Sequence, residues 1–316
     1  MGMNYDFNVE SKIKEIFKYF SEQIYRNLAL NLDNSFYKYI EEIRLRNGRQ
    51  VIVRFTGGEQ VIDYIVTTED LLKTLEKITE NSIYSYQNQI CNGFITVKGG
   101  HRVGLTGNVT VEDNRVVNIV HIYSLNFRIA REVKGCSDFL IKHICNGNSI
   151  YNTLIMGSPG SGKTTVLRDL IRNLSDGYEK RKGINIGLID ERSEISAMYR
   201  GIPQTDLGIR TDVLENIPKV LGIKMMVRAM APQVIAVDEI GGSDEADSIN
   251  YAMCSGVKGI FTAHGKSIND VRNNPELKLL LSKGIIEKIL VLDRNERGVL
   301  NKKYYFDKCQ GEYKEY

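Results

Sequence analysis

The chain has 316 residues, of which 42% are hydrophobic and 26% are charged. This is the composition of a globular protein, and the length is enough for two domains of ordinary size. The net charge of +3 is close to balanced and gives no general case for nucleic-acid binding. The five cysteines form no CxxC pair, which favours free thiols in a reducing compartment.

The N-terminus shows no signal-peptide pattern, and no apolar run approaches the roughly 20 residues that a membrane-spanning helix needs. We therefore expect a cytoplasmic protein without a membrane span of its own. Any place at a membrane would come from partner proteins.

Residues 1–134 carry the signals of a smaller N-terminal α+β domain. Hydrophobic residues from Ile13 to Ile24 recur at helical spacing and predict an amphipathic opening helix. The residues 67–70 resemble a capping box, which predicts the start of a second helix over residues 71–79.

The strands of this domain are predicted to form a mostly antiparallel sheet. The Asn47-Gly48 pair between two alternating segments is typical of a β-hairpin. Short strands separated by glycine favour a curved sheet. The strands are expected over residues 42–46, 51–53, 93–97, 101–105 and 118–131.

Residues 135–316 alternate between strand and helix signals, which predicts an α/β domain with a mainly parallel sheet flanked by helices. The strands are expected over residues 152–156, 184–189, 234–237 and 259–262, the helices over 165–174 and 212–230, and a closing hairpin over 285–293 and 303–306.

The segment between the first of these strands and its helix matches the pattern GxxxxGK[ST] at every fixed position. A glycine-rich loop before a helix brings backbone N–H groups and the positive end of the helix dipole onto one phosphate site. Lys163 is expected to reach the β and γ phosphates and Thr164 to ligate Mg²⁺. The alternative is a glycine-rich turn that fits by chance. The predicted ATP-binding set is Gly157, Ser158, Pro159, Gly160, Ser161, Gly162, Lys163, Thr164 and Thr165.

Asp238 and Glu239 follow four apolar residues of a predicted buried strand. Ligands of open parallel sheets bind at the carboxyl ends of the strands. We expect Asp238 to hold Mg²⁺, directly or through water, and Glu239 to orient or deprotonate an attacking water. The alternative is a solvated acidic turn at the end of a strand.

Other polar groups also follow predicted strands. Asp190 and Glu191 come after one strand, with Glu194 a helical turn further on, and His264 comes after another. His264 is a candidate sensor of the γ-phosphate and Glu191 a second candidate for activating water, although a structural role is as plausible for each. The four histidines show no metal-ligand spacing.

These elements, in this order, resemble the secretion-ATPase superfamily, which includes type II and type IV secretion ATPases and retraction motors. The P-loop, acidic box, Walker B strand and histidine box of that superfamily would be residues 157–164, 190–194, 234–239 and 261–264. The resemblance implies a RecA-like fold and a hexamer. One departure is Asp238, where those ATPases commonly have glycine, so the residue that activates water stays open between Glu239 and Glu191.

Further segments resemble the stage III sporulation protein AA family of endospore-forming Firmicutes. They are residues 42–46, 99–104, 127–132, 190–195 and 237–241. The N-terminal segments distinguish this family from general secretion ATPases. The resemblance implies a mother-cell cytoplasmic ATPase that serves membrane-embedded proteins of a channel complex between mother cell and forespore.

An arginine from a neighbouring subunit can raise the hydrolysis rate of a P-loop domain by about 10³ to 10⁵. The N-terminal block offers Arg102, Arg128 and Arg131 near the domain junction, and Arg128 or Arg102 is the candidate. Alternation places Arg128 on the face opposite its apolar neighbours. Solvated surface arginines are the alternative.

The resulting hypothesis is a Mg²⁺-dependent ATP hydrolase that drives mechanical work at a secretion-like complex, with no nucleic-acid partner. Two alternatives stay open. A nucleic-acid motor would need a basic or aromatic single-strand channel. A nucleotide-gated scaffold would bind ATP but barely turn it over.

Overall fold

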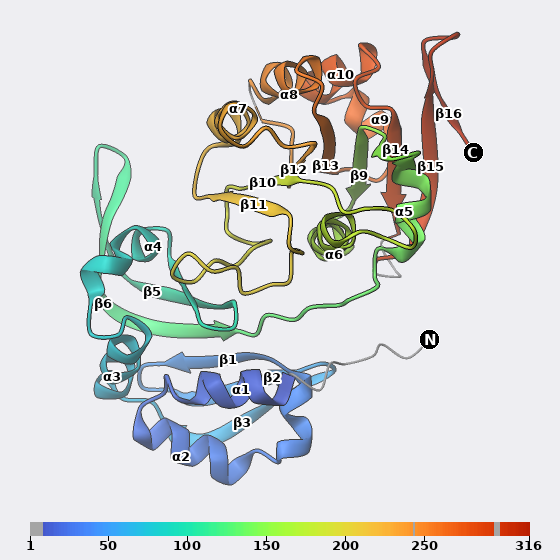
Figure 1. Cartoon of the computed structure of the whole chain (residues 1–316). Coiled ribbons are helices and arrows are strands. Elements are labelled where there is room, and N and C mark those ends of the chain that lie inside the picture. Colours follow the sequence, from blue (N-terminus) through green and yellow to red (C-terminus); the bar gives the residue numbers. More distant parts are fainter. Residues whose placement is uncertain (1–8, 243, 294–297) are drawn as a thin grey trace. The chain divides into compact units, whose positions relative to one another are not determined.

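The computed structural model describes residues 9–242, 244–293 and 298–316 (Figure 1). The chain divides into two units by its internal contacts. Unit 1 is Met1–Glu132 with Ala197–Gln204, and unit 2 is Val133–Ser196 with Thr205–Tyr316. The domain boundary between residues 134 and 135 stays a prediction.

Unit 1 is built on a six-stranded sheet in the order β3-β2-β1-β6-β5-β4. Every pairing between neighbouring strands is antiparallel, as the sequence predicts. The strands are β1 Ile40–Arg46, β2 Gln50–Phe55, β3 Gly58–Ile65, β4 Phe94–Val97, β5 His101–Glu112 and β6 Arg115–Arg128. The helices are α1 Val9–Phe17, α2 Glu22–Asn31, α3 Thr68–Ile78 and α4 Gln87–Cys91, with short 3₁₀ turns at Asn34–Tyr39 and Ile83–Tyr86.

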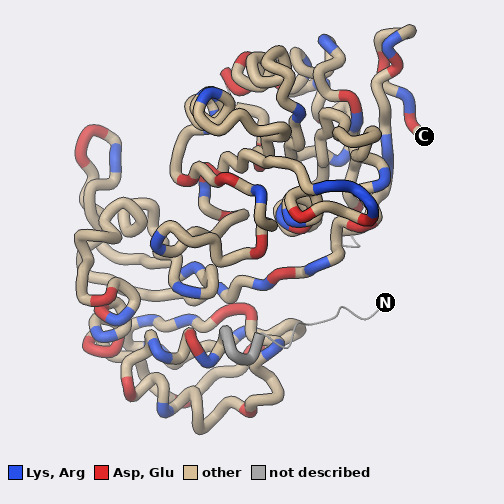
Figure 2. The backbone as a smooth tube through the Cα atoms, viewed as in Figure 1, with Lys and Arg blue, Asp and Glu red and all other residues tan. Residues whose placement is uncertain are grey.

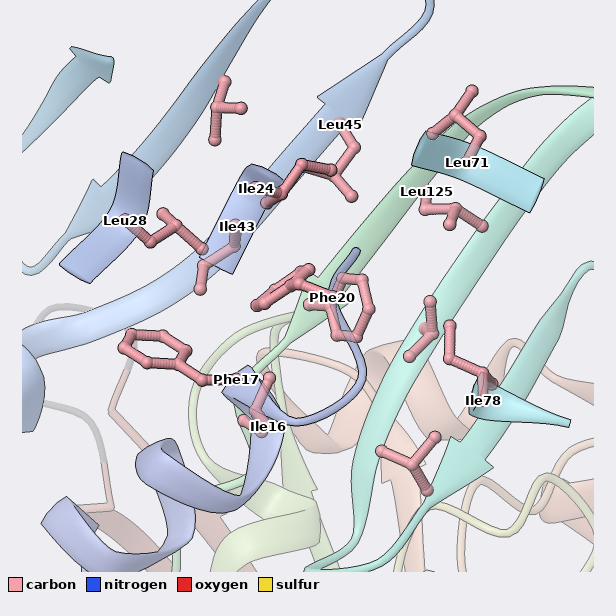
Figure 3. Packing of buried hydrophobic residues seen from close by; sticks show 14 of the residues in the cluster. Ile16, Phe17, Phe20, Ile24, Leu28, Ile43, Leu45, Leu71, Ile78 and Leu125 are labelled. Carbon is pink, nitrogen blue, oxygen red and sulfur yellow. The ribbon is translucent and has the colours of Figure 1, made fainter. Parts of the chain in front are cut away.

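One face of this sheet carries the core of unit 1. Ile43 of β1 and Phe127 of β6 are fully buried, whereas their neighbours along the strands point the other way. Phe20 packs on Phe127 with ring centroids 4.5 Å apart. Figure 3 shows Phe20, Ile24 and Leu28 gathered over the strands. The periodic apolar residues of the N-terminal segment therefore cover the sheet.

The single opening helix predicted over this segment is wrong, because two helices form. α1 ends at Phe17 and α2 begins at Glu22. The Ser21 side chain accepts a hydrogen bond from the Ile24 N–H at 3.3 Å, which caps the second helix. Apolar residues of both helices face the same core, so the helical spacing of these residues did not indicate the break between α1 and α2.

Unit 2 is built on an eight-stranded sheet in the order β11-β10-β12-β13-β9-β14-β15-β16. The strands from β11 to β14 in this order run parallel, and β15 and β16 add antiparallel pairings. The strands are β9 Thr153–Gly157, β10 Ile186–Asp190, β11 Thr211–Glu215, β12 Val234–Val237, β13 Lys258–His264, β14 Lys288–Leu292, β15 Leu300–Asp307 and β16 Glu312–Glu315. A small separate ribbon pairs β7 Cys145–Asn146 with β8 Ser149–Ile150.

Helices cover both faces of this sheet. Side chains of α5 and α6 pack on one face, and those of α7, α8, α9 and α10 pack on the other. The sheet is therefore buried on both sides, as the continuous apolar strands predict. The helices are α5 Asp138–Ile144, α6 Lys163–Asp176, α7 Lys219–Met230, α8 Glu245–Cys254, α9 Ile268–Arg272 and α10 Pro275–Ser282.

The helix predicted over residues 212–230 is wrong in its first part. Residues Thr211–Glu215 form β11, which pairs in parallel with β10, and the helix starts only at Lys219. Pro218 occupies the N-cap of α7, because proline cannot donate the hydrogen bond that a helix interior needs. Before Pro218 the chain forms a strand because its backbone pairs with the edge of β10.

Residues 197–204 leave unit 2 and pack within unit 1. The Gln204 side chain accepts a hydrogen bond from the Gly99 N–H at 2.8 Å. Tyr199 and Arg200 both bind the Glu80 carboxylate. The chain thus passes from the loop after β10 into unit 1 and back, which sequence patterns did not indicate.

Candidate nucleotide-binding site

The loop over residues 157–162 links the carboxyl end of β9 to the first residue of α6, as predicted. Gly160 and Gly162 have φ angles of +79° and +92°, which favour glycine. A Cβ on Gly157 would lie 2.3 Å from the Ser161 Oγ. The backbone path and close packing therefore require the three glycines.

Lys163 begins α6 and is buried. Its Nζ donates to the carbonyl oxygens of Gly157 at 3.0 Å and Ser158 at 3.2 Å. Burial lowers the pKa of Lys163, while the carboxylates of Asp238 and Glu239 act in the opposite direction. The ammonium group is thus held within the loop and close to the acidic pair.

Ser161 is completely buried, and its Oγ has no hydrogen-bond partner among the described residues. Its backbone carbonyl accepts a hydrogen bond from the Gly298 N–H at 2.9 Å. A buried hydroxyl without a partner carries a desolvation cost that a bound acceptor would remove. A phosphate oxygen is such an acceptor, so this residue fits a nucleotide in the loop.

Thr164 and Asp238 meet as the magnesium prediction requires. The Thr164 hydroxyl donates to Asp238 Oδ2 at 2.9 Å, and the Thr262 hydroxyl donates to Asp238 Oδ1. Burial raises the pKa of the Asp238 carboxyl, and Glu239 and Glu194 raise it further, against these two hydrogen bonds. A cation bound to this carboxylate would favour its charged form and so offset the effect of burial and of the neighbouring carboxylates on its pKa.

The remaining ligands for Mg²⁺ would come from phosphate and water. Among the described residues, no three His, Cys, Asp or Glu side chains are grouped so that they could hold a metal ion. Mg²⁺ in phosphate-binding enzymes uses one or two protein ligands and keeps several waters. Thr164 with Asp238 fits that pattern.

Glu239, which follows β12, is connected to Lys163 through His264. His264 Nε2 lies 3.2 Å from Glu239 Oε1, and His264 Nδ1 lies 3.2 Å from Lys163 Nζ. A lysine ammonium can only donate, so Nδ1 accepts and the ring proton sits on Nε2, facing Glu239. The predicted candidates Lys163, His264 and Glu239 thus form one connected chain.

The Glu239 backbone is held in an unusual conformation. Its φ is +54°, in the left-handed region that residues other than glycine seldom adopt. The Thr262 Oγ1 accepts from the Glu239 N–H at 2.8 Å, and Lys219 Nζ donates to the Glu239 carbonyl at 2.9 Å. Arg192 Nη1 donates to Glu239 Oε2 at 2.6 Å. Several contacts therefore fix where this carboxylate points.

The acidic residues after β10 have different surroundings. Asp190 is buried and accepts hydrogen bonds from the backbone N–H groups of Glu194, Ile195 and Ser196, so it shapes the loop. Glu191 lies 3.2 Å from Lys219 Nζ. Glu191, Glu194 and Glu239 line one small pocket with Asp238.

Arg102 and Arg128 lie in unit 1, where they face each other across β5 and β6. Arg128 is exposed beside the buried Phe127, as alternation predicts, and the Arg102 guanidinium lies 3.5 Å from the centre of the Phe94 ring. Their action on a nucleotide of another subunit stays a prediction.

Two residues that contact the acidic groups of this site were not identified as site residues from the sequence. Arg192 stands inside the acidic box, and its position directly after Glu191 was the available signal. Lys219 contacts Glu191, Glu245 and the Glu239 carbonyl, but it lies about a helix length before β12 and gave no signal.

The solved structures that resemble this chain define its class. The ATPase DotB of Legionella pneumophila is 15% identical, with a TM-score of 0.57 over 86% of this chain and 78% of that one. The pilus retraction motor PilT with bound ADP is 16% identical, with a TM-score of 0.56 over 85% of this chain and 76% of that one. The fold is therefore that of the RecA-like secretion ATPases, with an antiparallel N-terminal sheet in unit 1.

A family model described as sporulation stage III, protein AA, matches residues 10–310. Stage III sporulation protein AA of Bacillus subtilis (strain 168) is 41% identical over 255 residues, which cover 81% of this chain and 83% of that protein. The chain belongs to the stage III sporulation protein AA family. None of the described helices combines the length and apolar character that crossing a bilayer would require.

Proposed function

We propose that this protein is a Mg²⁺-dependent ATPase that drives mechanical work at a secretion-like channel complex between mother cell and forespore. The observation that carries the proposal is the contact of Thr164 with Asp238, joined to the chain from Lys163 through His264 to Glu239. The groups that we assign to phosphate binding and to water activation therefore lie at the edge of a parallel sheet where such sheets bind ligands. The family and its B. subtilis relative support the sporulation setting.

Each residue has a stated task in this proposal. The amides of the loop and Lys163 bind the phosphates, and the Ser161 hydroxyl, which has no partner among the described residues, donates to a phosphate oxygen. Thr164 and Asp238 hold the metal ion. Mg²⁺, when bound, neutralises charge that develops on the phosphate oxygens during transfer.

Glu239 is the better candidate than Glu191 for activating water. Its carboxylate is connected through His264 to Lys163, whereas Glu191 lies against Lys219. The hydrogen bond from Arg192 and the left-handed backbone hold the Glu239 carboxylate in place before any substrate arrives. A prearranged base of this kind contributes about 10² to 10⁴ in rate.

The test is the ATPase rate and ATP-analogue affinity of the purified chain and three variants. Lys163→Ala should lose both binding and hydrolysis while keeping the fold. Glu239→Gln should bind the analogue normally but lose roughly 10²-fold or more in kcat. Glu191→Gln is the matched control and should keep most of the rate. Chelation of Mg²⁺ should stop hydrolysis by the unaltered protein.

Two results would contradict the proposal. Unchanged affinity and rate in Lys163→Ala would exclude the loop as the nucleotide site. If a spore-forming strain with Glu239→Gln sporulates normally, the protein acts as a nucleotide-gated scaffold and not as a motor. Stimulation of hydrolysis by single-stranded DNA or RNA at low salt would favour a nucleic-acid motor.

A further inference from the structure

A second hollow lies in unit 2, at the opposite end of the parallel strands from the phosphate loop. It has a volume of about 420 Å³. Ile184 and Gln233, which line it, precede β10 and β12, so the hollow opens at the amino-terminal ends of these strands. The loop over residues 157–162 follows the carboxyl end of β9, which runs parallel to them. Nothing in the proposed ATPase cycle uses this hollow.

The lining of the hollow is basic. Lys180, Arg181 and Lys182 are consecutive, exposed and contribute to its wall. Among the described residues, no Asp or Glu lines the hollow. Figure 2 shows the three residues as one blue stretch in the segment after α6. Three positive charges against the single carboxylate of Glu179, which directly precedes them, favour an anionic ligand.

The basic segment is held in shape by its neighbours. Gly177 has a φ of +100°, and a Cβ there would lie 2.6 Å from the Arg181 carbonyl oxygen. A Cβ on Gly183 would lie 2.2 Å from the Ser175 carbonyl oxygen. The Ile184 N–H donates to the Leu174 carbonyl at 2.9 Å. The segment is therefore folded tightly against the end of α6, and its charges stay together.

Two further lining residues offer neutral hydrogen-bond donors. Asn148, in the turn between β7 and β8, and Ser149, the first residue of β8, line the hollow and are exposed. The guanidinium of Arg181 donates to the Gly147 carbonyl and so ties the basic segment to this turn. Cations together with amide or hydroxyl donors are groups that bind phosphate oxygens.

We propose that this hollow is a phosphate-recognition site, separate from the ATP site, that takes a phosphate-bearing head group through Lys180, Arg181 and Lys182. The volume falls in the range of about 300 to 1,000 Å³ that small-molecule sites occupy. The phosphate has two possible sources, an anionic phospholipid or a soluble phosphorylated small molecule. The proposal does not depend on ATP hydrolysis by this chain.

The test measures binding of the full-length protein to two probes. One arm sediments vesicles of phosphatidylglycerol in phosphatidylcholine, with pure phosphatidylcholine vesicles as the reference. The other arm titrates pyrophosphate into Lys163→Ala, which removes the cation of the ATP site. We expect the unaltered hollow to bind in at least one arm, more weakly as salt rises. Binding in the vesicle arm alone identifies a lipid head group, and binding in the pyrophosphate arm identifies a soluble ligand.

The deciding variants change the charge of the hollow. Lys180→Gln with Lys182→Gln should weaken binding roughly 25-fold, since each basic side chain near an anionic surface contributes about a factor of five. Lys278→Gln with Lys283→Gln removes two exposed charges at α10 and is the matched control, with no expected change. Asn148→Asp keeps every cation but adds a carboxylate to the wall, and it should weaken binding as well.

Three results would overturn the proposal. They are no binding in either arm, equal loss in the two lysine double variants, and normal binding by Asn148→Asp. Equal loss in the double variants would show attraction to overall charge and not to this hollow. Thermal unfolding of each variant distinguishes a loss of binding from a loss of fold.

Discussion

Single side chains in unit 2 carry tasks that can be separated by substitution. Ser161 and Arg192 are informative because neither was singled out for its own chemistry from the sequence. One is a buried hydroxyl without a partner among the described residues, and the other fixes the carboxylate that we assign to water activation. Their substitutions should therefore affect different measured quantities.

Ser161→Ala should leave the ligand-free protein as stable as before or more stable. An unpartnered buried hydroxyl costs about 1 to 3 kcal/mol, and alanine removes that cost. The same change should weaken binding of a non-hydrolysable ATP analogue by roughly ten- to 150-fold, the worth of one hydrogen bond to a charged group. Thermal unfolding and calorimetric titration measure the two effects.

The control for this experiment is Ser196→Ala. Ser196 is also completely buried, but its hydroxyl donates to Asp190 Oδ2 at 2.6 Å. Its loss should lower the unfolding temperature. If Ser161→Ala destabilises the protein as much as Ser196→Ala does, the Ser161 hydroxyl has a partner in solution and its assignment to phosphate is unsupported.

Arg192→Ala should lower kcat about three- to tenfold with little change in the KM for ATP. Arg192 touches Glu239 at 2.6 Å, so its loss affects the position of the carboxylate rather than the phosphate loop. The expected effect is moderate because the Arg192 side chain is 62% exposed and solvent screens the ion pair. Arg192→Lys should recover part of the rate. An effect on KM alone would place Arg192 in ground-state binding of ATP.

At the scale of elements, the helix caps show how local chemistry builds unit 1. The Thr67 hydroxyl accepts from the Asp70 N–H, and the Asp70 carboxylate accepts from the Thr67 N–H at 3.0 Å, which confirms the predicted capping box. Asp70 also accepts hydrogen bonds from the hydroxyls of Ser21 and Tyr64. The cap of α3 is thereby joined to the cap of α2, so one carboxylate orders two helices.

Asp70→Asn should lower the free energy of unfolding by about 1 to 3 kcal/mol at pH 7. Burial acts to raise the pKa of Asp70, but hydrogen bonds from Ser21, Thr67 and Tyr64 outweigh it and leave the pKa below its ordinary value of 3.8. A carboxyl group whose pKa is lowered by folding stabilises the folded state fully at a pH above its ordinary pKa. This contribution is lost as the pH falls through the folded-state pKa.

Denaturant unfolding of both proteins from pH 7 down to the acid range measures this effect. The difference between Asp70→Asn and the unaltered protein should shrink below pH 3.8, the ordinary value for the group. Asp63→Asn, at an exposed position on β3, serves as the control and should change stability little. A difference that is constant over the whole pH range would show that the charge of Asp70 has no part in its role.

At the scale of the whole molecule, the property to test is the assembly of several copies of the chain. A hexamer stays a prediction from the resemblance, and the candidate arginines Arg102 and Arg128 belong to a different unit from the proposed ATP site. The chain also passes from the loop that carries Glu191 and Arg192 directly into residues 197–204 of unit 1.

We expect a non-hydrolysable ATP analogue to convert the 35.9 kDa chain into a ring of six copies, measured by light scattering. Changing both Arg102 and Arg128 to alanine should reduce turnover of the ring far more than ATP binding, by up to about 10³-fold. Arg115→Ala, at the start of β6, is the matched control. A rate that survives the double substitution would rule out both arginines as catalytic groups in trans.

Some features of this protein follow from short stretches of sequence. The turn at Asn47-Gly48, the capping box of α3 and the loop over residues 157–162 each depend on residues a few positions apart, so their patterns identify them. The same holds for Asp238 and Glu239, because the end of a buried apolar strand can be located from its composition alone. The break between α1 and α2 could not be predicted in this way. The spacing of apolar residues indicates which residues face the same core, but it does not indicate where a helix ends.

Only the tertiary structure decided which of these groups meet. Thr164 and Asp238 are 74 positions apart, and Lys163 and His264 are 101 apart. Their contacts depend on the strand order β12-β13-β9, and no local pattern encodes that order. The same reason explains β11, the passage of residues 197–204 into unit 1 and the basic hollow after α6. The sequence by itself determined the chemical groups and the elements that carry them, whereas packing between distant segments determined their partners.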